Sequence, residues 1–370
     1  MSDIAFITGS RSEYSLMRRT LLELSKHIDI TIVATGMHLS PKFGYTVQEI
    51  ERDGFRVKKV DSLLDTDTLG GMAKSVGVCI YGVTAAIEEL SPEFVFVEGD
   101  RGEALAGALA GAYLNIPVIH HGGGDVSGSV DNKLRYAITM LSDYHLVGNP
   151  LSFSRLVRMG IPEGRIFNVG EPGIDDIYAG DFEPKEKIAE KYNIDLTQPM
   201  ILFVYHPNTM EYSKIYKQMY EIMEAIKELG FRTIAIYSNA DAGGRFINRI
   251  LDEYAEKLPF MDVYPHVPRR EFLGLMNACD VMVGNSSAGI VELPSFKKPF
   301  VCIGTRQENR LKAGNVLEVG FRKEEIVRAI KKALFDGKFR ESLNNIENPY
   351  GDGKTYLRIC RVVLDLIGMG

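Results

Sequence analysis

The segment Val118–Asp131 reads VIHHGGGDVSGSVD, and its order of residue types shows how the chain is built. It begins as the apolar end of a strand, passes through two histidines and three glycines, and closes at Asp131, where an amphipathic helix is predicted. Glycine permits a sharp turn and a close approach of the backbone to a ligand. Titratable side chains at the carboxyl end of a strand are typical of sites in α/β proteins. The alternative is a glycine-rich connection that binds nothing.

The same order of strand, turn and helix recurs along the chain and predicts the fold class. Short apolar strands, among them Ile4–Thr8, Phe94–Val97 and Val281–Val283, run into polar or glycine-rich turns and then into helical patterns. Continuous apolar strands are expected when helices cover both faces of a parallel sheet. Prolines and glycines interrupt the alternation between residues 170 and 197. We therefore expect two Rossmann-like, doubly wound α/β domains that face each other across a cleft.

Composition narrows the function classes. A chain of 370 residues is too long for one ordinary core, and 45% hydrophobic with 25% charged residues is typical of a soluble globular protein. A net charge of −6 argues against a nucleic-acid-binding surface. The four cysteines form no CxxC pair, which favours reduced, buried thiols in a cytoplasmic protein. Because Ala104–Ile119, the most apolar long run, is too short for a membrane span, we expect no membrane association. The chain enters an apolar strand at Ile4–Ile7, so we expect no signal peptide.

The segment GNSSAG at Gly284–Gly289 ends one predicted strand and begins a helix. Free backbone N–H groups and two serine hydroxyls, Ser286 and Ser287, would suit a diphosphate. Glu292 follows in the same helix, where its carboxylate could accept both hydroxyls of a ribose, and Arg306 follows the next strand. The simpler interpretation is N-capping by one of the serines. Neither a GxxxxGK[ST] nor a GxGxxG motif is present.

Two further segments offer groups that could bind phosphate. Arg11 lies in the first turn after a strand, with Ser15 four residues on, and guanidinium donors match phosphate oxygens in pairs. His206 ends a strand and could stabilise a diphosphate leaving group, either as a neutral donor or as an imidazolium. A surface arginine and a structural histidine are the alternatives.

Asp100 and Asp131 are the candidate acid–base pair. Both follow predicted strands, and removal of a weakly acidic C–H proton requires a positioned base. Arg135 lies one helical turn after Asp131, so we expect it to hold that carboxylate ionised. The alternative is that Asp131 is only a helix N-cap.

Short motifs occur in order along nearly the whole chain: GSRSEYS (Gly9–Ser15), EGDRGEALA (Glu98–Ala106), GGDVSGSVDNKLRYAITMLSDYH (Gly123–His145), HPNT (His206–Thr209), NADAG (Asn239–Gly243), HVPRREF (His266–Phe272), GNSSAGIVE (Gly284–Glu292), GTRQ (Gly304–Gln307) and YGDG (Tyr350–Gly353). In this set the chain resembles the hydrolysing UDP-N-acetylglucosamine 2-epimerases, in the sialic-acid branch that includes the epimerase half of the bifunctional animal enzyme. The resemblance implies a glycosyltransferase-B (GT-B) architecture. Residues 1–172 would form the sugar-side domain, 173–354 the UDP-binding domain, and 355–370 a helix that returns to the first.

The resemblance also implies roles for single residues. Positions around the sugar and the catalytic centre match Asp100, Arg101 and Asp131, and Val267 matches a position that meets uracil through its backbone. Positions that hold UDP match Arg11, Ser15, His206, Asn239, Ser286, Ser287, Glu292 and Arg306. The implied reaction removes the C2 proton as UDP leaves C1, and water then adds to the 2-acetamidoglycal with inversion at C2, releasing N-acetylmannosamine. The resemblance implies no nicotinamide, no other cofactor and no metal, and a homo-oligomer, as a dimer or tetramer.

The chain departs from the resemblance at Gly122. Many members carry HxEGG here, and this chain has Gly122 in place of the glutamate. We expect Asp125 or His121 to take over a proton transfer. The alternative is a pocket reshaped for UDP- or GDP-linked N,N′-diacetylbacillosamine or for GDP-N-acetylglucosamine. A glycosyltransferase on the same fold and a catalytically silent nucleotide-sugar sensor are the remaining interpretations.

Overall fold

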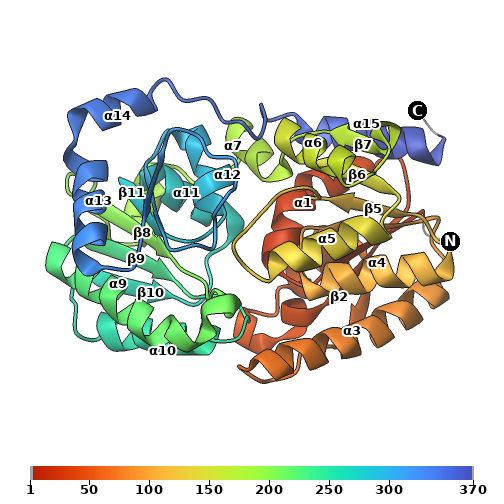
Figure 1. The fold of residues 1–370 in the computed structure, drawn as a ribbon, viewed down its shortest axis with the longest axis horizontal. Helices are drawn as coiled ribbons and strands as arrows, with labels where there is room; N and C mark the ends of the chain where they lie inside the picture. The colour runs from red at the N-terminus through yellow and green to blue at the C-terminus, as the bar shows by residue number, and fades with distance from the viewer. Residues whose placement is uncertain (1–2, 369–370) are drawn as a thin grey trace.

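The protein consists of two parallel β-sheets, each covered by helices on both faces, that lie side by side (Figure 1). The structure is a computed structural model that describes residues 3–368. In Figure 1 the N-terminal half, in red to yellow, lies on the right, and most of the C-terminal half, in green to blue, lies on the left. The predicted class of two doubly wound α/β units is confirmed.

The N-terminal sheet has seven parallel strands in the order β3-β2-β1-β4-β5-β6-β7. Its strands are β1 (Ile4–Thr8), β2 (Ile30–Thr35), β3 (Arg56–Val60), β4 (Phe94–Glu98), β5 (Val118–His121), β6 (Tyr144–Val147) and β7 (Ile166–Asn168). The chain reverses its direction of winding between β1 and β4, and the groups that follow these two strands therefore meet at one crevice.

Helices cover the two faces of this sheet. The helices of this half are α1 (Arg11–Leu24), α2 (Val47–Arg52), α3 (Leu69–Leu90), α4 (Gly102–Leu114), α5 (Asp131–Leu141) and α6 (Pro150–Arg158). The next helix, α7 (Asp175–Tyr178), buries Ile177 in a core cluster of the C-terminal half. One core cluster packs α1 and α2 against the sheet, and a second packs α3, α4 and α5 against the opposite face. The last helix of the chain, α15 (Thr355–Ile367), buries Ile359 and Val363 in the first cluster, beside α1.

The C-terminal sheet repeats the same winding. Its strands are β8 (Met200–Val204), β9 (Arg232–Ile236), β10 (Met261–Tyr264), β11 (Val281–Gly284), β12 (Phe300–Ile303) and β13 (Val316–Val319), in the order β10-β9-β8-β11-β12-β13. Its helices are α8 (Lys185–Lys191), α9 (Ile215–Leu229), α10 (Gly244–Ala255), α11 (Arg269–Ala278), α12 (Ala288–Val291), α13 (Lys323–Phe335) and α14 (Gly337–Leu343). Here the reversal falls between β8 and β11.

Three strands have no continuous apolar pattern in the sequence and were not predicted, and all three lie at sheet edges. Strands β3, β10 and β13 are each at an edge, and each is mostly half-buried or exposed. Polar residues such as Lys58 and Glu318 interrupt their apolar pattern because one side of an edge strand meets water. The helix expected to begin after GNSSAG and to contain Glu292 is shorter than expected, because α12 has only four residues, Glu292 is its C-cap, and a 3₁₀ turn follows over Leu293–Phe296.

Helix α3 is long and apolar enough to cross a membrane, judged by length and composition alone. Among residues 3–368 it is the one helix with this property, and 28% of its most apolar window is buried. Its inner face packs Cys79 and Val83 into the core, while Tyr81 on its outer face is exposed. Core helices of soluble proteins share this composition, so the property decides nothing by itself.

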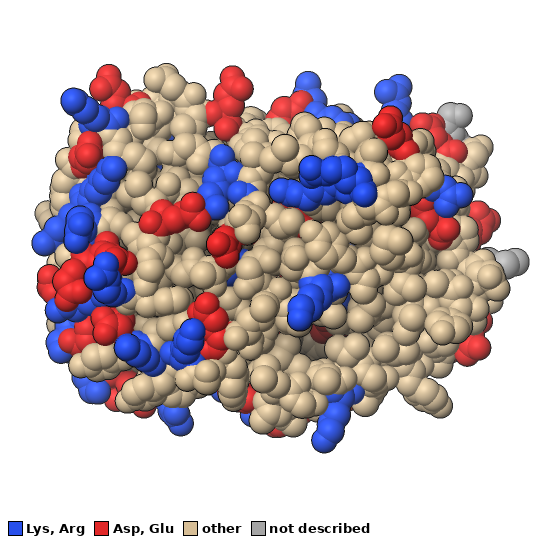
Figure 2. All heavy atoms as spheres, viewed as in Figure 1, with Lys and Arg blue, Asp and Glu red and all other residues tan. Residues whose placement is uncertain are grey.

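Charged side chains of both signs are mixed on the face shown in Figure 2. Acidic and basic groups alternate over the C-terminal half on the left, and the N-terminal half shows broad uncharged areas. Nucleic-acid backbones are held by contiguous basic patches. On this face of the described residues no such stripe joins the two halves.

Candidate active site

A cleft lies where the carboxyl edges of the two sheets face each other. It encloses a cavity of about 370 Å³. Its walls come from the turns after β1, β4 and β5 on one side and from those after β8, β9, β11 and β12 on the other. The points where the chain reverses its winding, between β1 and β4 and between β8 and β11, both lie at this cleft. Doubly wound sheets bind ligands at such points. The cleft lining includes Arg11, Ser15, Asp100, Arg101, Asp125, Asp131, His206, Asn239, Ser286, Ser287, Glu292 and Arg306.

Asp100 follows β4, and its ion-pair partner differs from the predicted arrangement. The spacing within α5 had suggested that Arg135 pairs with Asp131. In the structure Arg135 pairs with Asp100 instead. Arg135 is 2% exposed and also donates to the backbone oxygen of Asp125 at 3.2 Å. Burial opposes ionisation of Asp100, but the surrounding arginines, with Arg135 foremost, hold the pKa of this carboxyl below its usual value. Asp100 is therefore the ionised carboxylate of the candidate pair.

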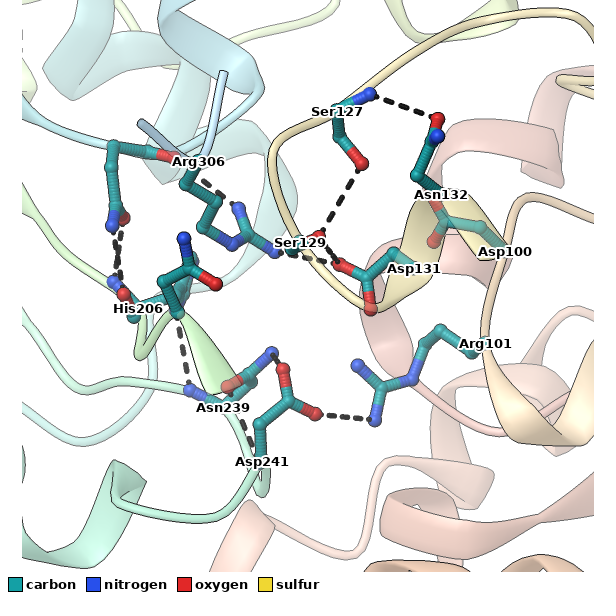
Figure 3. A network of polar contacts seen from close by, with 12 residues as sticks. Asp100, Arg101, Ser127, Ser129, Asp131, Asn132, His206, Asn239, Asp241 and Arg306 are labelled. Atoms are coloured by element: carbon teal, nitrogen blue, oxygen red, sulfur yellow. Dashed lines mark hydrogen bonds and ion pairs between the residues drawn. The ribbon is translucent and has the colours of Figure 1, made fainter. Parts of the chain in front are cut away.

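Asp131 is the first residue of α5, and its surroundings favour the protonated form. The N-cap position is held by Val130, so Asp131 does not cap the helix. Its Oδ2 accepts a hydrogen bond of 2.8 Å from Ser129 and lies 3.5 Å from Nη2 of Arg306 (Figure 3). Burial, followed by the negative charge of Asp100, raises the pKa of Asp131. Two neighbouring carboxyls with pKa values moved in opposite directions suit a base and an acid.

The glycine-rich turn after β5 contains two buried histidines with different roles. His120 lies 2.8 Å from the backbone oxygen of Gly99, and burial lowers its pKa to about 3, so it is neutral and ties β5 to the turn after β4. His121 forms an ion pair of 2.7 Å with Glu98. Burial opposes its charge, but Glu98 and Glu171 outweigh burial and raise the pKa of His121 to about 10. Neither histidine lines the cleft.

Asp125 reaches the cleft from the same turn and is paired across the two halves. Its Oδ2 lies 2.8 Å from Nε of Arg310, which follows β12. The other carboxylate oxygen, Oδ1, is buried and has no hydrogen-bond partner within the described structure. An unsatisfied buried acceptor requires an explanation, and a hydroxyl or amide of a ligand would satisfy it.

The same turn is fastened to the C-terminal half at Gly128. Its N–H donates to the backbone oxygen of Arg306 at 3.0 Å, and its carbonyl accepts from Nδ2 of Asn208 at 2.9 Å. A Cβ at Gly128 would lie 2.0 Å from the backbone oxygen of Thr305, so the close approach requires glycine. The turn that carries Asp125 and Asp131 is thus hydrogen-bonded to the segment after β12, which carries Arg306.

The turn after β11 presents the predicted diphosphate donors. Asn285 connects β8 to β11, because its side chain accepts from the N–H of His206 at 2.7 Å and donates to its carbonyl at 2.8 Å. Ser286 is buried and Ser287 is exposed to the cleft. Because α12 is so short, its dipole is small, and the donors are the hydroxyls and backbone N–H groups. Arg306 donates to the carbonyl of Asn285 at 3.2 Å and lies beside them.

His206 is held in a defined orientation at the end of β8. Its Nδ1 accepts a hydrogen bond of 3.3 Å from the N–H of Asn239, so the proton of the neutral ring is on Nε2 (Figure 3). Burial, followed by the charge of Arg306, lowers the pKa of His206 to about 3. Of the two predicted forms, the structure therefore favours the neutral donor while no anion is bound.

Arg11 and Glu292 have partners that the sequence did not reveal. A capping box formed by Ser10 and Glu13 places Arg11 at the first position of α1, and the guanidinium donates to the backbone oxygen of Val267 in the other half. Arg11 therefore lies beside the expected uracil contact, and Ser15 lines the cleft one turn later. Glu292 is buried and paired with Arg269.

Arg101 links the two halves across the cleft. It extends from the turn after β4, and its Nη2 donates to Oδ1 of Asp241 at 3.3 Å (Figure 3). Asp241 in turn accepts from Nδ2 of Asn239 at 2.6 Å. Sequence reasoning overlooked Asp241, Arg269 and Arg310, although the first two lie within the quoted NADAG and HVPRREF motifs. Within residues 3–368, no group of three or more histidine, cysteine, aspartate or glutamate side chains is placed to hold a metal.

At Gly284 we expect even a substitution by alanine to reduce stability and UDP affinity. Its φ is +139°, and an added Cβ would lie 1.9 Å from the backbone oxygen of Val204. Gly284→Ala should lower the free energy of unfolding by at least about 2 kcal/mol, because two strands must separate and the backbone is strained. Thermal unfolding and UDP titration calorimetry measure the loss of stability and of affinity. Gly337→Ala, where a Cβ meets nothing within 4 Å, is the control; equal melting temperatures for both variants would contradict the expectation.

The two doubly wound sheets and the cleft between them define a GT-B-like fold. A family model described as UDP-N-acetylglucosamine 2-epimerase matches residues 21–364. The chain is 38% identical over 363 residues to the UDP-N,N′-diacetylbacillosamine 2-epimerase (hydrolyzing) of Legionella pneumophila, covering 97% of this chain and 95% of the relative. It is 32% identical over 320 residues to the GDP/UDP-N,N′-diacetylbacillosamine 2-epimerase (hydrolyzing) of Campylobacter jejuni, covering 85% and 83%.

The solved structures agree with this fold. The UDP-GlcNAc 2-epimerase of Neisseria meningitidis bound to UDP-GlcNAc superposes with a TM-score of 0.83 at 21% identity, covering 98% of this chain and 99% of that one. The chain therefore belongs to the UDP-N-acetylglucosamine 2-epimerase family, in its hydrolysing branch, and it is a nucleotide-sugar 2-epimerase.

Proposed function

We propose that this enzyme acts preferentially on UDP-N,N′-diacetylbacillosamine, releasing UDP and the C2-inverted sugar. The observation that carries this choice is the 38% identity to a relative named for that sugar, with 32% identity to a second. Gly122 supports it, because it lines the cleft without a side chain at the position where the resemblance expects a glutamate, and we expect a bulkier sugar substituent to use that space. The product would enter sialic-acid-type sugar synthesis. A cytoplasmic location and a homo-oligomer remain predictions.

The first step would transfer the C2 proton of the sugar to Asp100, which the arginines around it keep ionised. The electron pair of the C–H bond forms the C1=C2 double bond, and the bond from C1 to the diphosphate oxygen breaks. Asp131, whose pKa is raised and which lies beside Arg306, would donate a proton to the departing diphosphate oxygen. Positioned proton transfer of this kind contributes about 10²–10⁴-fold to a rate.

The departing diphosphate would be stabilised from the C-terminal half. Arg306 supplies positive charge, Nε2–H of His206 supplies a neutral donor, and the hydroxyls of Ser286 and Ser287 add two more. Charge that develops on a leaving group in an enclosed site is stabilised by such preorganised donors. Binding of the anion would also raise the pKa of His206, which helps it to share its proton.

UDP-N-acetylglucosamine is the second candidate substrate, because the matching family model carries that name. The two sugars differ at C4 and C6, so the same C2 chemistry would apply to both. Incubating the enzyme with each UDP-sugar separately in D₂O, and following the reaction by proton NMR, tests both candidates. We expect UDP release without an acceptor, deuterium at C2 of the inverted sugar, and a higher kcat/KM for the diacetylated substrate.

Other outcomes assign other functions. A higher kcat/KM for UDP-N-acetylglucosamine would reverse the substrate choice while keeping the reaction. A product that retains its original C2 hydrogen and appears only with an acceptor would indicate a glycosyltransferase. Binding of UDP without release of free sugar from either substrate would indicate a sensor.

A further inference from the structure

Glu171 is a carboxylate that lines the cleft on the side away from Asp100. It follows β7, whereas Asp100 follows β4, and Gly122 at the end of β5 lies between them in the order β4-β5-β6-β7. Neighbouring strands are about 5 Å apart, so β4 and β7 are separated by roughly 15 Å. The carboxylate of Glu171 reaches back over Gly148, which follows β6, roughly 10 Å from β4. A sugar bound over the backbone of Gly122 would therefore have one carboxylate on each side.

The backbone of the neighbouring strand makes room for this carboxylate. A Cβ at Gly148, directly after β6, would lie 2.0 Å from Oε1 of Glu171. Gly148 has no positive φ, so its backbone is accessible to any residue and the glycine is required for space. The backbone N–H of Glu171 is held by the carbonyl of Tyr350 at 2.8 Å. The side chain of Glu171 therefore lies in a defined recess beside the cleft.

The His121–Glu98 pair lies behind this recess. Nε2 of His121 lies 3.0 Å from the backbone oxygen of Gly170, the residue before Glu171. Charged His121 thus donates both ring protons, one to Glu98 and one to the chain at Gly170. This arrangement fixes the turn that carries Glu171 and puts a cation next to it. His121 is thereby a positioning residue and does not reach the cleft itself.

Glu171 is protonated at a pH where an ordinary glutamate is ionised. Burial raises its pKa to about 7, and the charge of His121 acts in the opposite direction. The charged and titratable groups that face it are His121, Glu98, Asp125, Arg310 and Tyr350. Among residues 3–368 no hydrogen bond or ion pair to its carboxylate is formed, so its proton is available to a ligand. A carboxyl poised near neutral pH is suited to general acid catalysis.

We propose that Glu171 is the acid that protonates C2 during hydration of the glycal. This role rests on the proposed function, in which Asp100 removes the C2 proton from the other side. Glu171 gives its proton to C2, the electrons of the C1=C2 bond form the new C–H bond, and water binds at C1 and loses a proton to solvent. Glu171 then regains a proton from solvent. Because removal and return occur on opposite sides of the ring, C2 is inverted.

The test supplies the 2-acetamidoglycal of the substrate sugar directly and measures its hydration. Glu171→Gln should slow hydration by about 10²-fold or more, while the first step continues and glycal accumulates beside released UDP. Gly148→Ala, which displaces the carboxylate but keeps it, should show the same accumulation. Glu163→Gln, an exposed glutamate nearby in the sequence, is the matched control.

Stability separates catalysis from a structural role. A carboxyl whose folded-state pKa is raised contributes stability below its unfolded pKa of about 4.5, and that stability is lost as pH rises through about 7. Glu171→Gln should therefore melt at the same or a higher temperature than the wild type at pH 8. Wild-type hydration rates in Glu171→Gln, or a lower melting temperature at pH 8, would overturn the proposal. Absence of wild-type turnover would instead reject the proposed function.

Discussion

Asp100→Asn should lower kcat by about 10²–10⁴-fold while UDP binding stays within a few-fold of wild type. The amide keeps the shape of the side chain but cannot accept the C2 proton. Because the loss falls on the first step, neither free UDP nor glycal should accumulate. This pattern differs from the one expected for Glu171→Gln, in which UDP is released and glycal builds up.

The assay for this variant is single-turnover release of UDP together with exchange of deuterium at C2. Asp61→Asn, which changes an exposed carboxylate, is the matched control. If Asp100→Asn released UDP at the wild-type rate, another group would be the base, and Asp131 would be the next to test. If UDP affinity fell as much as the rate, the residue would serve binding.

Arg135→Leu should reduce both stability and activity. It removes a cation that is 2% exposed and leaves Asp100 without its main partner, a change that costs of the order of 3 kcal/mol. The pKa of Asp100 should rise, because burial then acts against weaker opposing charge. The acidic limb of the pH–rate profile should move to higher pH, and kcat at pH 7 should fall.

The pH dependence of stability has a definite sign for this variant. In the wild type the pKa of Asp100 is lowered, so it contributes stability above its unfolded value of about 3.8 that is lost as pH falls through the folded value. In Arg135→Leu this contribution is diminished. The deficit in melting temperature should therefore be larger at pH 7 than at pH 4. Lys133→Leu, exposed on the same helix, is the control; an equal deficit at both pH values would contradict the assignment.

The sequence predicts most of this fold because buried parallel strands are continuous apolar runs. Strands such as β4 and β11 have no exposed face, so their ends, and the polar turns that follow, are visible in the residues. The missed strands β3, β10 and β13 have exposed faces and interrupted patterns. The early end of α12 has a signal that the prediction overlooked, because Pro294 lacks the N–H that a helix through Leu293–Phe296 would need.

The sequence predicts those site residues that directly follow a strand. It does not predict which side chains from different strands form ion pairs. Arg135 was assigned to Asp131 from the helical spacing of four, but the fold brings Asp100 from another strand to the same guanidinium. Glu171 follows a three-residue strand in a proline-rich join, where it resembles any polar linker residue. Its recess depends on the missing side chain of Gly148, which no spacing rule connects to it.

The hydrogen bonds at Gly128 have a consequence for the order of events in turnover. The turn that carries Asp125 and Asp131 is bound to the backbone of Arg306, whose side chain faces the diphosphate site. Any widening of the cleft that frees UDP must break these bonds and displace both carboxylates. We therefore expect UDP to leave at the same time as Asp125 and Asp131 move away from Arg306. On the proposed mechanism, the glycal would therefore stay enclosed with both carboxylates until these bonds break.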